Sequence, residues 1–381
     1  MNTAATIASI LLGGTAVVSA AYYFVSARLL RRWLAKGRAF ESEDAALPPV
    51  TFFRPLKAGV PDLRSKLEGL ATAMRVGDQL LIGVEAGSVE KTVAAEIARA
   101  FTEKEIAVIC CDPSRTRNPK VSKLVQMVEH ARHERWILSD SEAVLGAEFL
   151  RSFRHEWLQC DVLTAGYRFD GARTWPQRLD ATAILLTLWP GLAVLSNRGP
   201  LRLTLGACTG FRRADLAAID GWAAFGDALA EDYQLGVVLA ATGRKILLSR
   251  EVVTLASDPL TWSDYWRHQR RVAITYRVSN PLGFAGAWLT QGVTAAFIFA
   301  CVHPAHLWSW ALFLIVWAAR VLSATTMSRR LEFPMPDPWL SVLLTSFVET
   351  TCWALSWTSR SVWWGGTRWR IGRDGRLRPR P

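Results

Sequence analysis

Charged side chains are missing from two long stretches of this 381-residue chain. Residues 2–27 and residues 278–319 contain no Asp, Glu, Lys or Arg. In the first stretch, residues 7–25 form an apolar run long enough to span the ~30 Å hydrocarbon core of a bilayer as a helix. A basic cluster follows this run and none precedes it (Arg28, Arg31, Arg32, Lys36 and Arg38). We therefore predict an N-terminal transmembrane anchor in residues 1–40, with residue 28 onward in the cytoplasm, rather than a cleaved signal peptide.

The second charge-free stretch predicts further membrane helices. Pro304 divides it into residues 284–302 and 306–319, which favours a helical hairpin. A third apolar stretch, residues 339–357, contains Glu349. We assign residues 281–358 to C-terminal membrane helices and residues 359–381 to a basic tail.

The charges around the third apolar stretch conflict with a simple span. Arg329 and Arg330 precede it, and residues 360–380 hold seven Arg against one Asp. Both flanks therefore favour the cytoplasmic side, although one full span cannot connect two segments on the same side. Three alternatives stay open: the stretch is re-entrant, it lies in the membrane interface, or the charge rule misplaces the tail.

Residues 45–280 carry nearly all the acidic side chains and alternate short apolar runs with amphipathic patterns. The apolar runs, which we predict to be buried strands, are residues 50–53, 80–84, 106–111 and 136–139. The amphipathic patterns, which we predict to be helices, are residues 63–73, 89–101 and 121–131. This alternation predicts an α/β domain with a largely parallel sheet and ligands at the carboxyl ends of its strands. No G-x-G-x-x-G follows the first strand and no P-loop motif occurs, so neither a dinucleotide-binding site nor a P-loop is supported.

One apolar stretch, residues 181–195, lies inside this globular part. At about 15 residues it is short for a membrane span. It is either a buried core helix or an interfacial helix that dips toward lipid and shapes an acceptor entrance.

Charge and cysteine content exclude some classes of function. The formal net charge is +12, but the excess arginine lies beside apolar segments rather than in a soluble basic stripe. We therefore expect no nucleic-acid partner. The six cysteines form no C-x-x-C pair, which argues against a zinc ribbon and a disulfide scaffold.

Two carboxylates follow a predicted strand directly. Asp140 and Glu142 are two residues apart, and such a pair can share a hard divalent cation, Mg²⁺ or Mn²⁺, together with substrate phosphates. The alternative is a solvated loop.

Two predicted helix starts also carry charged side chains. Glu231 and Asp232 open a helical pattern, where acids usually serve as caps but where a reactive carboxylate could act as a general base. Lys120 follows Asn118 and Pro119, and there it could meet a phosphate together with the free backbone N–H groups.

A basic segment precedes the second charge-free stretch. It reads Arg267-His268-Gln269-Arg270-Arg271 and follows an aromatic cluster. It either forms a juxtamembrane belt for anionic lipid headgroups or supplies arginines that grip a diphosphate.

Taken in order, these motifs resemble the ceramide glucosyltransferase family of membrane glycosyltransferases, including the bacterial hopanoid-biosynthesis glycosyltransferase. The resemblance covers roughly residues 50–279. The matching motifs are Phe53-Arg54-Pro55-Leu56-Lys57, Leu81-Ile82-Gly83-Val84, Asn118-Pro119-Lys120, Leu138-Ser139-Asp140-Ser141, Cys208-Thr209-Gly210, Ala230-Glu231-Asp232-Tyr233 and His268-Gln269-Arg270-Arg271. The tail from Trp369 to Gly375 also looks like the bacterial lipid-modifying members.

The resemblance implies a GT-A-type nucleotide-sugar fold in residues 45–280 and an inverting transfer from a UDP-sugar to a lipid hydroxyl of the ceramide or hopanoid class. It implies a multi-pass protein of the inner (cytoplasmic) membrane whose catalytic domain faces the cytoplasm. By position, Asp232 would be the general base beside Glu231, and Arg271 would steady the diphosphate or the acceptor. Asp140 and Glu142 would hold Mg²⁺ or Mn²⁺. The donor site would be formed by Lys57, Glu85, Lys120, Asp140, His268 and Gln269.

The sequence departs from the family pattern at three places. An early nucleotide-binding Asp is replaced by Glu85 or Ala86, and the D-x-D motif ends in Glu142. The last motif begins with His268 and has Val272 where Trp is expected. These departures leave a catalytically degenerate lipid-binding homologue as one alternative to the lipid glycosyltransferase. A processive polysaccharide synthase, which would share the GT-A domain, is the other alternative, although Val272 and the short membrane portion argue against it.

Overall fold

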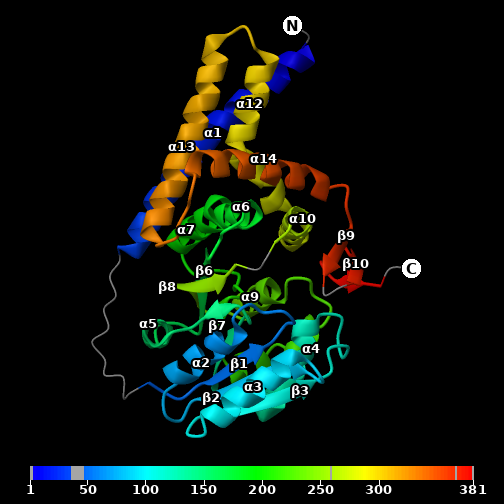
Figure 1. The fold of residues 1–381 in the computed structure, drawn as a ribbon. Coiled ribbons are helices and arrows are strands. Elements are labelled where there is room, and N and C mark those ends of the chain that lie inside the picture. Colours follow the sequence, from blue (N-terminus) through cyan, green and yellow to red (C-terminus); the bar gives the residue numbers. More distant parts are fainter. Residues whose placement is uncertain (1–2, 36–46, 258–259, 365–366, 380–381) are drawn as a thin grey trace.

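The computed structural model describes residues 3–35, 47–257, 260–364 and 367–379. Figure 1 shows an α/β part below and a bundle of long helices that projects from it. The bundle is formed by α1 (Thr3–Leu34), α12 (Gly292–Val302) and α13 (Leu307–Arg330). The predicted fold class, an α/β domain with apolar helices toward both ends of the chain, is confirmed.

An eight-stranded sheet forms the centre of the described α/β part, in the order β3-β2-β1-β4-β7-β6-β8-β5. The strands are β1 (Thr51–Pro55), β2 (Gln79–Glu85), β3 (Glu105–Cys111), β4 (Arg135–Ser139), β5 (Ala143–Val144), β6 (Val162–Asp170), β7 (Cys208–Arg212) and β8 (Ile246–Ala256). The first four strands in this order are parallel, as predicted. The other half is mixed, because β7 lies antiparallel between β4 and β6, while β8 is parallel to β6.

The helices of this part cover both faces of the sheet. They are α2 (Leu63–Ala73), α3 (Val89–Ala100), α4 (Pro119–Met127), η2 (Val128–His130), α5 (Ala147–Trp157), α8 (Arg213–Ala217), η4 (Trp222–Phe225), α9 (Glu231–Ala241) and α10 (Trp262–Ser279). Phe52 belongs to the core formed with α2, α3 and α5, whereas Phe53 packs on the opposite face against Trp136 and α4. Because successive strand residues point to opposite faces, and both faces are buried, the parallel strands appear in the sequence as unbroken apolar runs.

The N-terminal helix α1 belongs to both parts. Its last turns place Leu30 and Trp33 in the same buried core as Phe53, and the Asn197 side chain on α7 (Trp189–Arg198) donates a hydrogen bond to Leu29 O at 3.1 Å. The predicted membrane anchor is therefore also a structural element of the α/β core.

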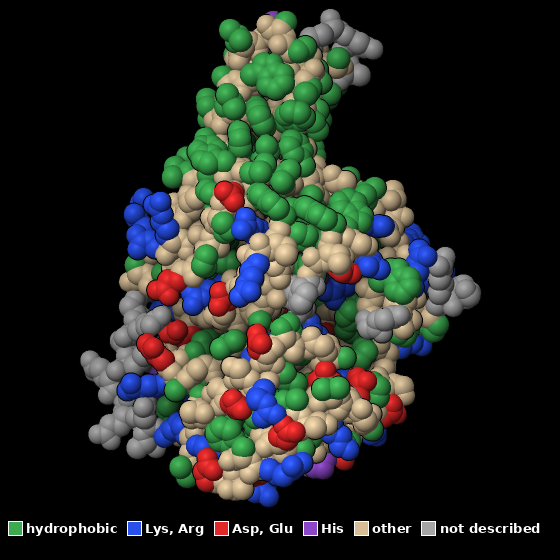
Figure 2. Space-filling model, in the orientation of Figure 1, with side chains coloured by type: hydrophobic (Ala, Val, Ile, Leu, Met, Phe, Trp, Pro, Cys, Tyr) green, Lys and Arg blue, Asp and Glu red, His purple; other side chains and the backbone are tan. Residues whose placement is uncertain are grey.

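Hydrophobic side chains cover the projecting bundle, whereas charged side chains gather on the lower part (Figure 2). The described residues contain three helical runs long and apolar enough to cross a membrane, Ala5–Leu34, Trp175–Arg198 and Leu307–Arg330, or four if one bent pair counts as a span. The bent pair corrects the prediction of one helix over residues 284–302. The segment is broken into α11 (Pro281–Gly286), η5 (Ala287–Thr290) and α12, with a bend of 55°.

The run Trp175–Arg198 consists of α6 (Trp175–Ala183), the π-helical η3 (Ile184–Leu188) and α7. It lies between the sheet and the bundle in Figure 1, and most of its side chains are buried. The Trp189 ring packs on Gly166 of β6, where an added Cβ would come within 2.5 Å of it. This packing agrees with a core helix, the first alternative for residues 181–195.

Helix α14 (Pro338–Ser356) runs across the bundle instead of along it (Figure 1). Arg320 on α13 binds it through Ser346 Oγ and Glu349 Oε2, each at 2.7 Å. Trp339 and Trp357, at the two ends of α14, are exposed. Exposed indoles at both ends are typical of a helix in the membrane interface. A crosswise α14 also removes the charge conflict, because both of its flanks can lie on one side.

Residues predicted only as a basic tail form a three-stranded antiparallel sheet. We call it the C-terminal sheet; its strands are β9 (Ser361–Trp364), β10 (Thr367–Ile371) and β11 (Leu377–Arg378). Its apolar side chains Val362, Ile371 and Leu377 are buried with Leu229 and Ile274. The tail therefore packs against α10 and against the segment that leads into α9.

Candidate active site

The predicted site residues lie at one edge of the sheet. Lys57 follows β1, Glu85 ends β2 and Asp140 follows β4. Because these strands are parallel, their carboxyl ends meet at the same edge, where ligands of open α/β sheets bind. The helix starts with Lys120 and with Glu231 and Asp232 face this edge.

Lys120 is at the centre of a buried cluster of charges. Its Nζ lies 2.7 Å from Asp140 Oδ1 and 2.8 Å from Glu231 Oε1. Burial alone would lower the pKa of Lys120, but the carboxylates of Asp140, Glu231 and Asp232 raise it well above its ordinary value. Lys120 is therefore a permanent cation at this edge.

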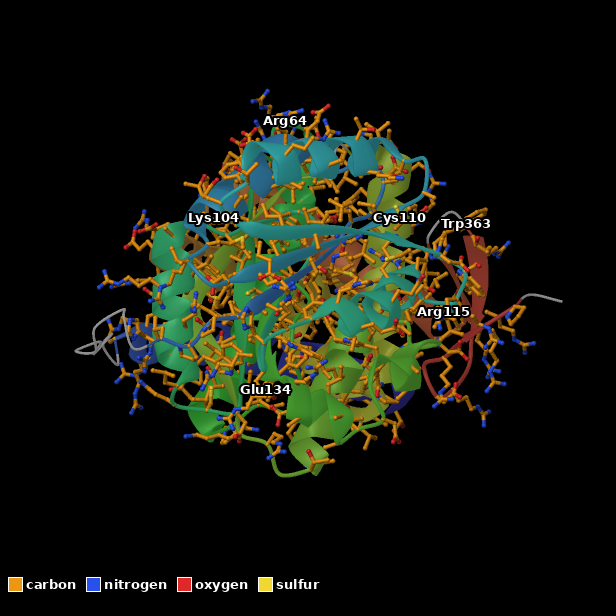
Figure 3. All side chains as sticks on the ribbon, turned by 90° about the horizontal axis from the view of Figure 1, so that it is seen from below. Arg64, Lys104, Cys110, Arg115, Glu134 and Trp363 are labelled. Atoms are coloured by element: carbon orange, nitrogen blue, oxygen red, sulfur yellow. The ribbon has the colours of Figure 1, made fainter. Side chains whose placement is uncertain are left out.

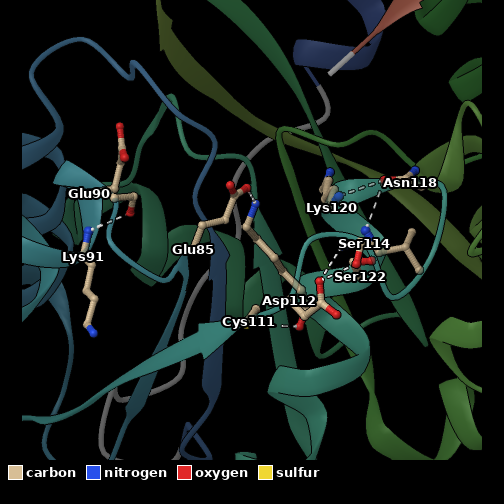
Figure 4. Close-up of polar contacts among 12 residues, drawn as sticks. Glu85, Glu90, Lys91, Cys111, Asp112, Ser114, Asn118, Lys120 and Ser122 are labelled. Carbon is tan, nitrogen blue, oxygen red and sulfur yellow. Dashed lines mark hydrogen bonds and ion pairs between the residues drawn. The ribbon is translucent and has the colours of Figure 1, made fainter. Parts of the chain in front are cut away.

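Asn118 holds Lys120 in place by capping α4. Its Oδ1 accepts hydrogen bonds from the backbone N–H groups of Lys120 and Val121 at 2.9 and 3.1 Å, and its Nδ2 donates to Glu231 Oε2 at 3.0 Å. Figure 4 shows Asn118 and Lys120 at the start of α4, with Glu85 in the same close-up. The cap thus connects the starts of α4 and α9.

Gly206 marks the point on which three functional groups converge. An ideal Cβ on this residue would lie 2.9 Å from Asp140 Oδ2, 3.1 Å from Asp232 Oδ2 and 3.4 Å from Lys120 Nζ. The backbone therefore passes directly beside the charged groups, and only glycine leaves room between them. No sequence motif pointed to Gly206.

Asp232 and Glu231 differ in protonation although they are neighbours. Burial, together with the charge of Glu231, raises the pKa of Asp232 to about 7. Burial also acts to raise the pKa of Glu231, but the ion pair with Lys120 outweighs it and lowers that pKa. A carboxylate with a pKa near the working pH is suited to accept a proton, whereas Glu231 stays charged as a partner of Lys120.

A buried arginine fixes the loop that carries Asp140 and Glu142. Arg54 Nη1 donates to Ser139 Oγ at 2.8 Å, and Nη2 donates to the carbonyls of Ser141 and Ala143. Arg54 is fully buried, and burial lowers its pKa to about 10. One role of the motif at residues 53–57 is thus structural: Arg54 holds the loop that carries Asp140 and Glu142.

The two predicted metal ligands each have a lysine partner. Asp140 binds Lys120, and Glu142 forms an ion pair with Lys57. No group of three or more His, Cys, Asp or Glu side chains suited to a metal occurs among the described residues. Two carboxylates nevertheless fit a hard divalent cation whose other ligands are the oxygens of a bound diphosphate.

The basic segment on α10 forms a second cluster, centred on Asp180 of α6. Gln269 Nε2 donates to Asp180 Oδ1 at 2.7 Å, and His268 Nε2 lies 3.5 Å from the same oxygen. Burial, then the charges of Arg271 and Lys57, lowers the pKa of His268 to about 3, so the ring is neutral. A guanidinium only donates, so His268 Nδ1 accepts the 3.0 Å hydrogen bond from Arg271 Nη2 and its proton lies on Nε2.

Arg271 connects this second cluster with the first. Burial lowers its pKa, while the nearby groups of Asp180, Tyr167, Glu231 and Glu142 act in the opposite direction. The Arg271 guanidinium is therefore within electrostatic reach of carboxylates of both clusters. Asp180 and Tyr167 were not predicted as site residues, and neither lies in a recognisable motif.

Glu85 lies apart from both clusters. Its carboxylate forms an ion pair with Lys123 on α4 at 2.6 Å. Glu85 lies at the same edge of the sheet, at the end of β2, but no contact in the described structure links Glu85 to Gly206 or Arg271.

Comparisons with known proteins indicate the family and the fold of the chain. The sequence model described as glycosyl transferase family 21 matches residues 11–377. A comparison with curated proteins finds no significant match. Among solved structures, the mannosyltransferase PcManGT from Pyrobaculum calidifontis, in complex with GDP-Man and Mn²⁺, is similar over 90% of this chain and 98% of its own, with a TM-score of 0.54 and 17% identity.

A second solved structure is more distant. TarS 1–349 from S. aureus, in complex with UDP-GlcNAc, matches 86% of this chain and 98% of its own, with a TM-score of 0.35 and 14% identity. The similarity to PcManGT supports the predicted glycosyltransferase fold, and the family match extends over nearly the whole chain. The chain therefore belongs to glycosyl transferase family 21 and is a nucleotide-sugar glycosyltransferase.

Proposed function

We propose that the protein transfers a sugar from a UDP-sugar to a hydroxyl group of a membrane lipid, of the ceramide or hopanoid class, with inversion at the anomeric carbon. The observation that carries this proposal is the convergence of Asp140, Asp232 and Lys120 at Gly206, with the Asp232 carboxyl at a pKa of about 7. The UDP donor and the lipid class rest on the motif resemblance described above.

Asp232 is the general base of the proposed reaction. Its Oδ1 accepts a hydrogen bond from the Tyr233 backbone N–H at 2.8 Å, and its Oδ2 faces the convergence point. Oδ2 takes the proton of the acceptor hydroxyl while the hydroxyl oxygen bonds to the anomeric carbon. The bond from that carbon to the diphosphate breaks in the same step, and the diphosphate leaves with the electron pair. A single displacement of this kind inverts the configuration.

Cationic side chains stabilise the departing diphosphate. Lys120 and Arg271 present fixed positive charges at this edge, and Lys57 lies beside Glu142. When bound, Mg²⁺ or Mn²⁺ adds charge neutralisation at the diphosphate, and Asp140 with Glu142 would hold it. Glu231 keeps Lys120 oriented and takes no proton itself.

The membrane helices supply the route for an apolar acceptor. Helix α10, which carries the basic segment, packs against α14, where Ala273 of α10 is buried with Cys352 of α14. The helix of the basic segment therefore joins the candidate site to the apolar helices. The basic residues at the lower end of α1 (Arg28, Arg31, Arg32) and of α13 (Arg329, Arg330) support a cytoplasmic orientation of the catalytic part in the inner membrane.

Nucleotide release by the purified protein tests this function. Full-length protein in detergent with Mg²⁺ or Mn²⁺ is given UDP-sugars or GDP-mannose, crossed with ceramide, diacylglycerol and a polyol hopanoid. We expect UDP release that depends on both metal and lipid, and a product whose anomeric configuration, determined by NMR, is opposite to that of the donor. Release without lipid dependence, or a polymeric product, would contradict the proposal.

A pair of variants tests the base. We expect Asp232→Asn to abolish transfer while UDP-sugar binding by calorimetry persists. Asp220→Asn is the matched control, because Asp220 is exposed, lies outside the site and has a positive φ of 59° that asparagine tolerates well. Full turnover by Asp232→Asn would refute the assignment.

A further inference from the structure

The C-terminal sheet carries an unusual concentration of arginine. Its described part and the residue before it contain six arginines and one acid (Arg360, Arg368, Arg370, Arg373, Arg376, Arg378 and Asp374). Four of these arginines, Arg360, Arg370, Arg373 and Arg378, line one cavity of about 360 Å³, which we call the arginine pocket. The pocket lies outside the site described above.

The arginine pocket has the charge of an anion site. Arginine stays protonated at any physiological pH, so four guanidinium groups around one cavity repel each other. Asp374 compensates part of this charge through Arg378 Nη2, at 3.3 Å. A phosphate group matches the remaining cations, because guanidinium groups bind phosphate oxygens through two parallel hydrogen bonds.

The position of the pocket indicates where that phosphate comes from. Four residues, Trp357 to Arg360, connect the end of α14 to β9, so Arg360 lies within about 14 Å of that end. Trp357 and Trp363 are 44% and 54% exposed, and exposed indoles are typical of the headgroup region of a bilayer. Arg277 links the two elements, since its Nη2 donates to Ser359 O at 2.8 Å and its guanidinium lies over the Trp357 ring. In Figure 1 the C-terminal sheet is located directly below the end of α14.

The C-terminal sheet is also bonded to the segment that precedes the catalytic helix α9. Leu377 N donates to Asp227 O at 2.7 Å, and Leu229 N donates to Gly375 O at 3.3 Å. Arg117 Nη1 connects Asp227 Oδ2, at 2.7 Å, with Leu377 O, at 3.2 Å. Figure 3 shows Arg115, in the segment before α4, on the same side as Trp363 of this sheet. A ligand that orders the sheet therefore also holds the segment two residues before Glu231.

We propose that the arginine pocket binds the phosphate of an anionic phospholipid headgroup in the surrounding leaflet, and that this binding fixes the C-terminal sheet against residues 227–229. Charge complementarity, the neighbouring interfacial tryptophans and the short link to α14 carry the proposal. Lipid is thus a ligand of this protein at a place separate from the acceptor site, and the proposal does not depend on the proposed transfer reaction.

Lipid-dependent thermal stability of the full-length protein tests this binding. Protein in a neutral detergent is titrated with phosphatidylglycerol or phosphatidylcholine, and the unfolding temperature is followed by intrinsic tryptophan fluorescence. We expect saturable stabilisation by phosphatidylglycerol alone. The variant Arg370→Gln with Arg373→Gln should need at least ~10-fold more lipid for half-saturation, because it removes two charged donors, and hydrogen bonds from charged donors are stronger than neutral ones.

The matched control is Arg368→Gln with Arg376→Gln. It removes the same charge from the same sheet, but neither residue lines the pocket. We expect it to retain the wild-type titration curve. An equal loss in both variants would mean that diffuse charge, and not the pocket, attracts the lipid, and would overturn the proposal.

A soluble phosphate separates the two possible sources of the anion. Glycerol 1-phosphate at the same phosphate concentration should stabilise the protein far less than the lipid does. Equal stabilisation would show that a free phosphate suffices and would overturn the lipid assignment. If the double variant fails to fold, Arg373→Gln alone replaces it, since Arg373 is exposed, and a wild-type response there would again refute the proposal.

Discussion

Gln269 on α10 donates a hydrogen bond of 2.7 Å to Asp180 on α6, and this contact holds the basic segment at the catalytic edge. His268 faces the same Asp180 oxygen and accepts a hydrogen bond from Arg271. The Asp180 carboxylate therefore orients Gln269 and His268 directly and, through His268, Arg271. Gln269 is buried, so removing the Asp180 carboxylate leaves the Gln269 amide without this acceptor.

Asp180 is accordingly a positioning residue, and its substitution should affect turnover. We expect Asp180→Ala to lower kcat by roughly 10–100-fold, because small displacements of groups that stabilise the transition state are costly. Asp180→Asn keeps an acceptor oxygen for Gln269 and should restore most of kcat. Steady-state kinetics with varied UDP-sugar measures both variants. Equal losses in Ala and Asn, accompanied by equal losses in unfolding temperature, would indicate a merely structural role.

Substitution of Gly206 should lower the activity of the protein without lowering its thermal stability. The methyl group of Gly206→Ala would occupy the convergence point of Asp140, Asp232 and Lys120, so we expect transfer to fall by at least ~100-fold. The unfolding temperature should change little, because the nearest atoms are side-chain ends. Activity and thermal unfolding are measured together with Gly146→Ala, whose added Cβ would meet nothing within 4 Å. Wild-type activity of Gly206→Ala would place the reacting atoms elsewhere.

The sequence predicted the parallel half of the sheet because burial on both faces leaves an unmistakable apolar run in each strand. Asp140, Glu231 and Asp232 were predicted because the family resemblance implied roles for these acids, which stand at a strand end or a helix start. Asp180 and Gly206 were not, because their importance comes from contacts between residues distant in the sequence: α6 meets α10, and the loop before β7 passes Asp140.

The membrane part was harder to predict for a related reason. Hydropathy measures length and apolarity but not direction, so the sequence could not decide between a span and an interfacial course for residues 339–357, and α14 runs across the bundle. The bend between Thr290 and Gly292 has no proline inside it, so the sequence did not predict it. The C-terminal sheet was missed because seven arginines obscured its few alternating apolar residues.

Activity should depend on pH through Asp232. With its pKa raised to about 7, Asp232 is protonated in acid and becomes a base only as the pH rises. We expect kcat/KM to rise about tenfold per pH unit below pH ~7 and to level off above it. Glu231→Gln removes a charge that raises this pKa, so the break should move to lower pH. A flat profile between pH 5.5 and 8.5 in buffers of constant ionic strength would exclude Asp232 as the base.

Arg54 should control the affinity for the divalent cation without touching substrate. Arg54→Lys keeps the charge but cannot donate to Ser139 Oγ and to the two carbonyls at once. We expect the half-saturating Mn²⁺ concentration for transfer to rise roughly 10–100-fold, as for other residues that orient metal ligands. Chelation by EDTA should abolish transfer, and added Mn²⁺ should restore it. An unchanged Mn²⁺ requirement in a folded Arg54→Lys protein would show that Arg54 does not orient the loop that carries Asp140 and Glu142.

The crosswise course of α14 predicts which segments share a side of the membrane. Single cysteines are placed at Ala305, on the loop between α12 and α13, and at Arg376 on the C-terminal sheet, in a background with Cys110→Ser and Cys301→Ser, since both native cysteines are exposed. A membrane-impermeant maleimide should label the cysteine at position 305 in intact cells, and the one at position 376 only after permeabilisation. Both tail and catalytic part then lie in the cytoplasm, as the basic helix ends indicate. Labelling at position 376 in intact cells would mean that α14 crosses the bilayer. The C-terminal sheet and the catalytic part would then lie on opposite sides of the membrane. That result would contradict the contacts of the C-terminal sheet with Asp227 and Leu229.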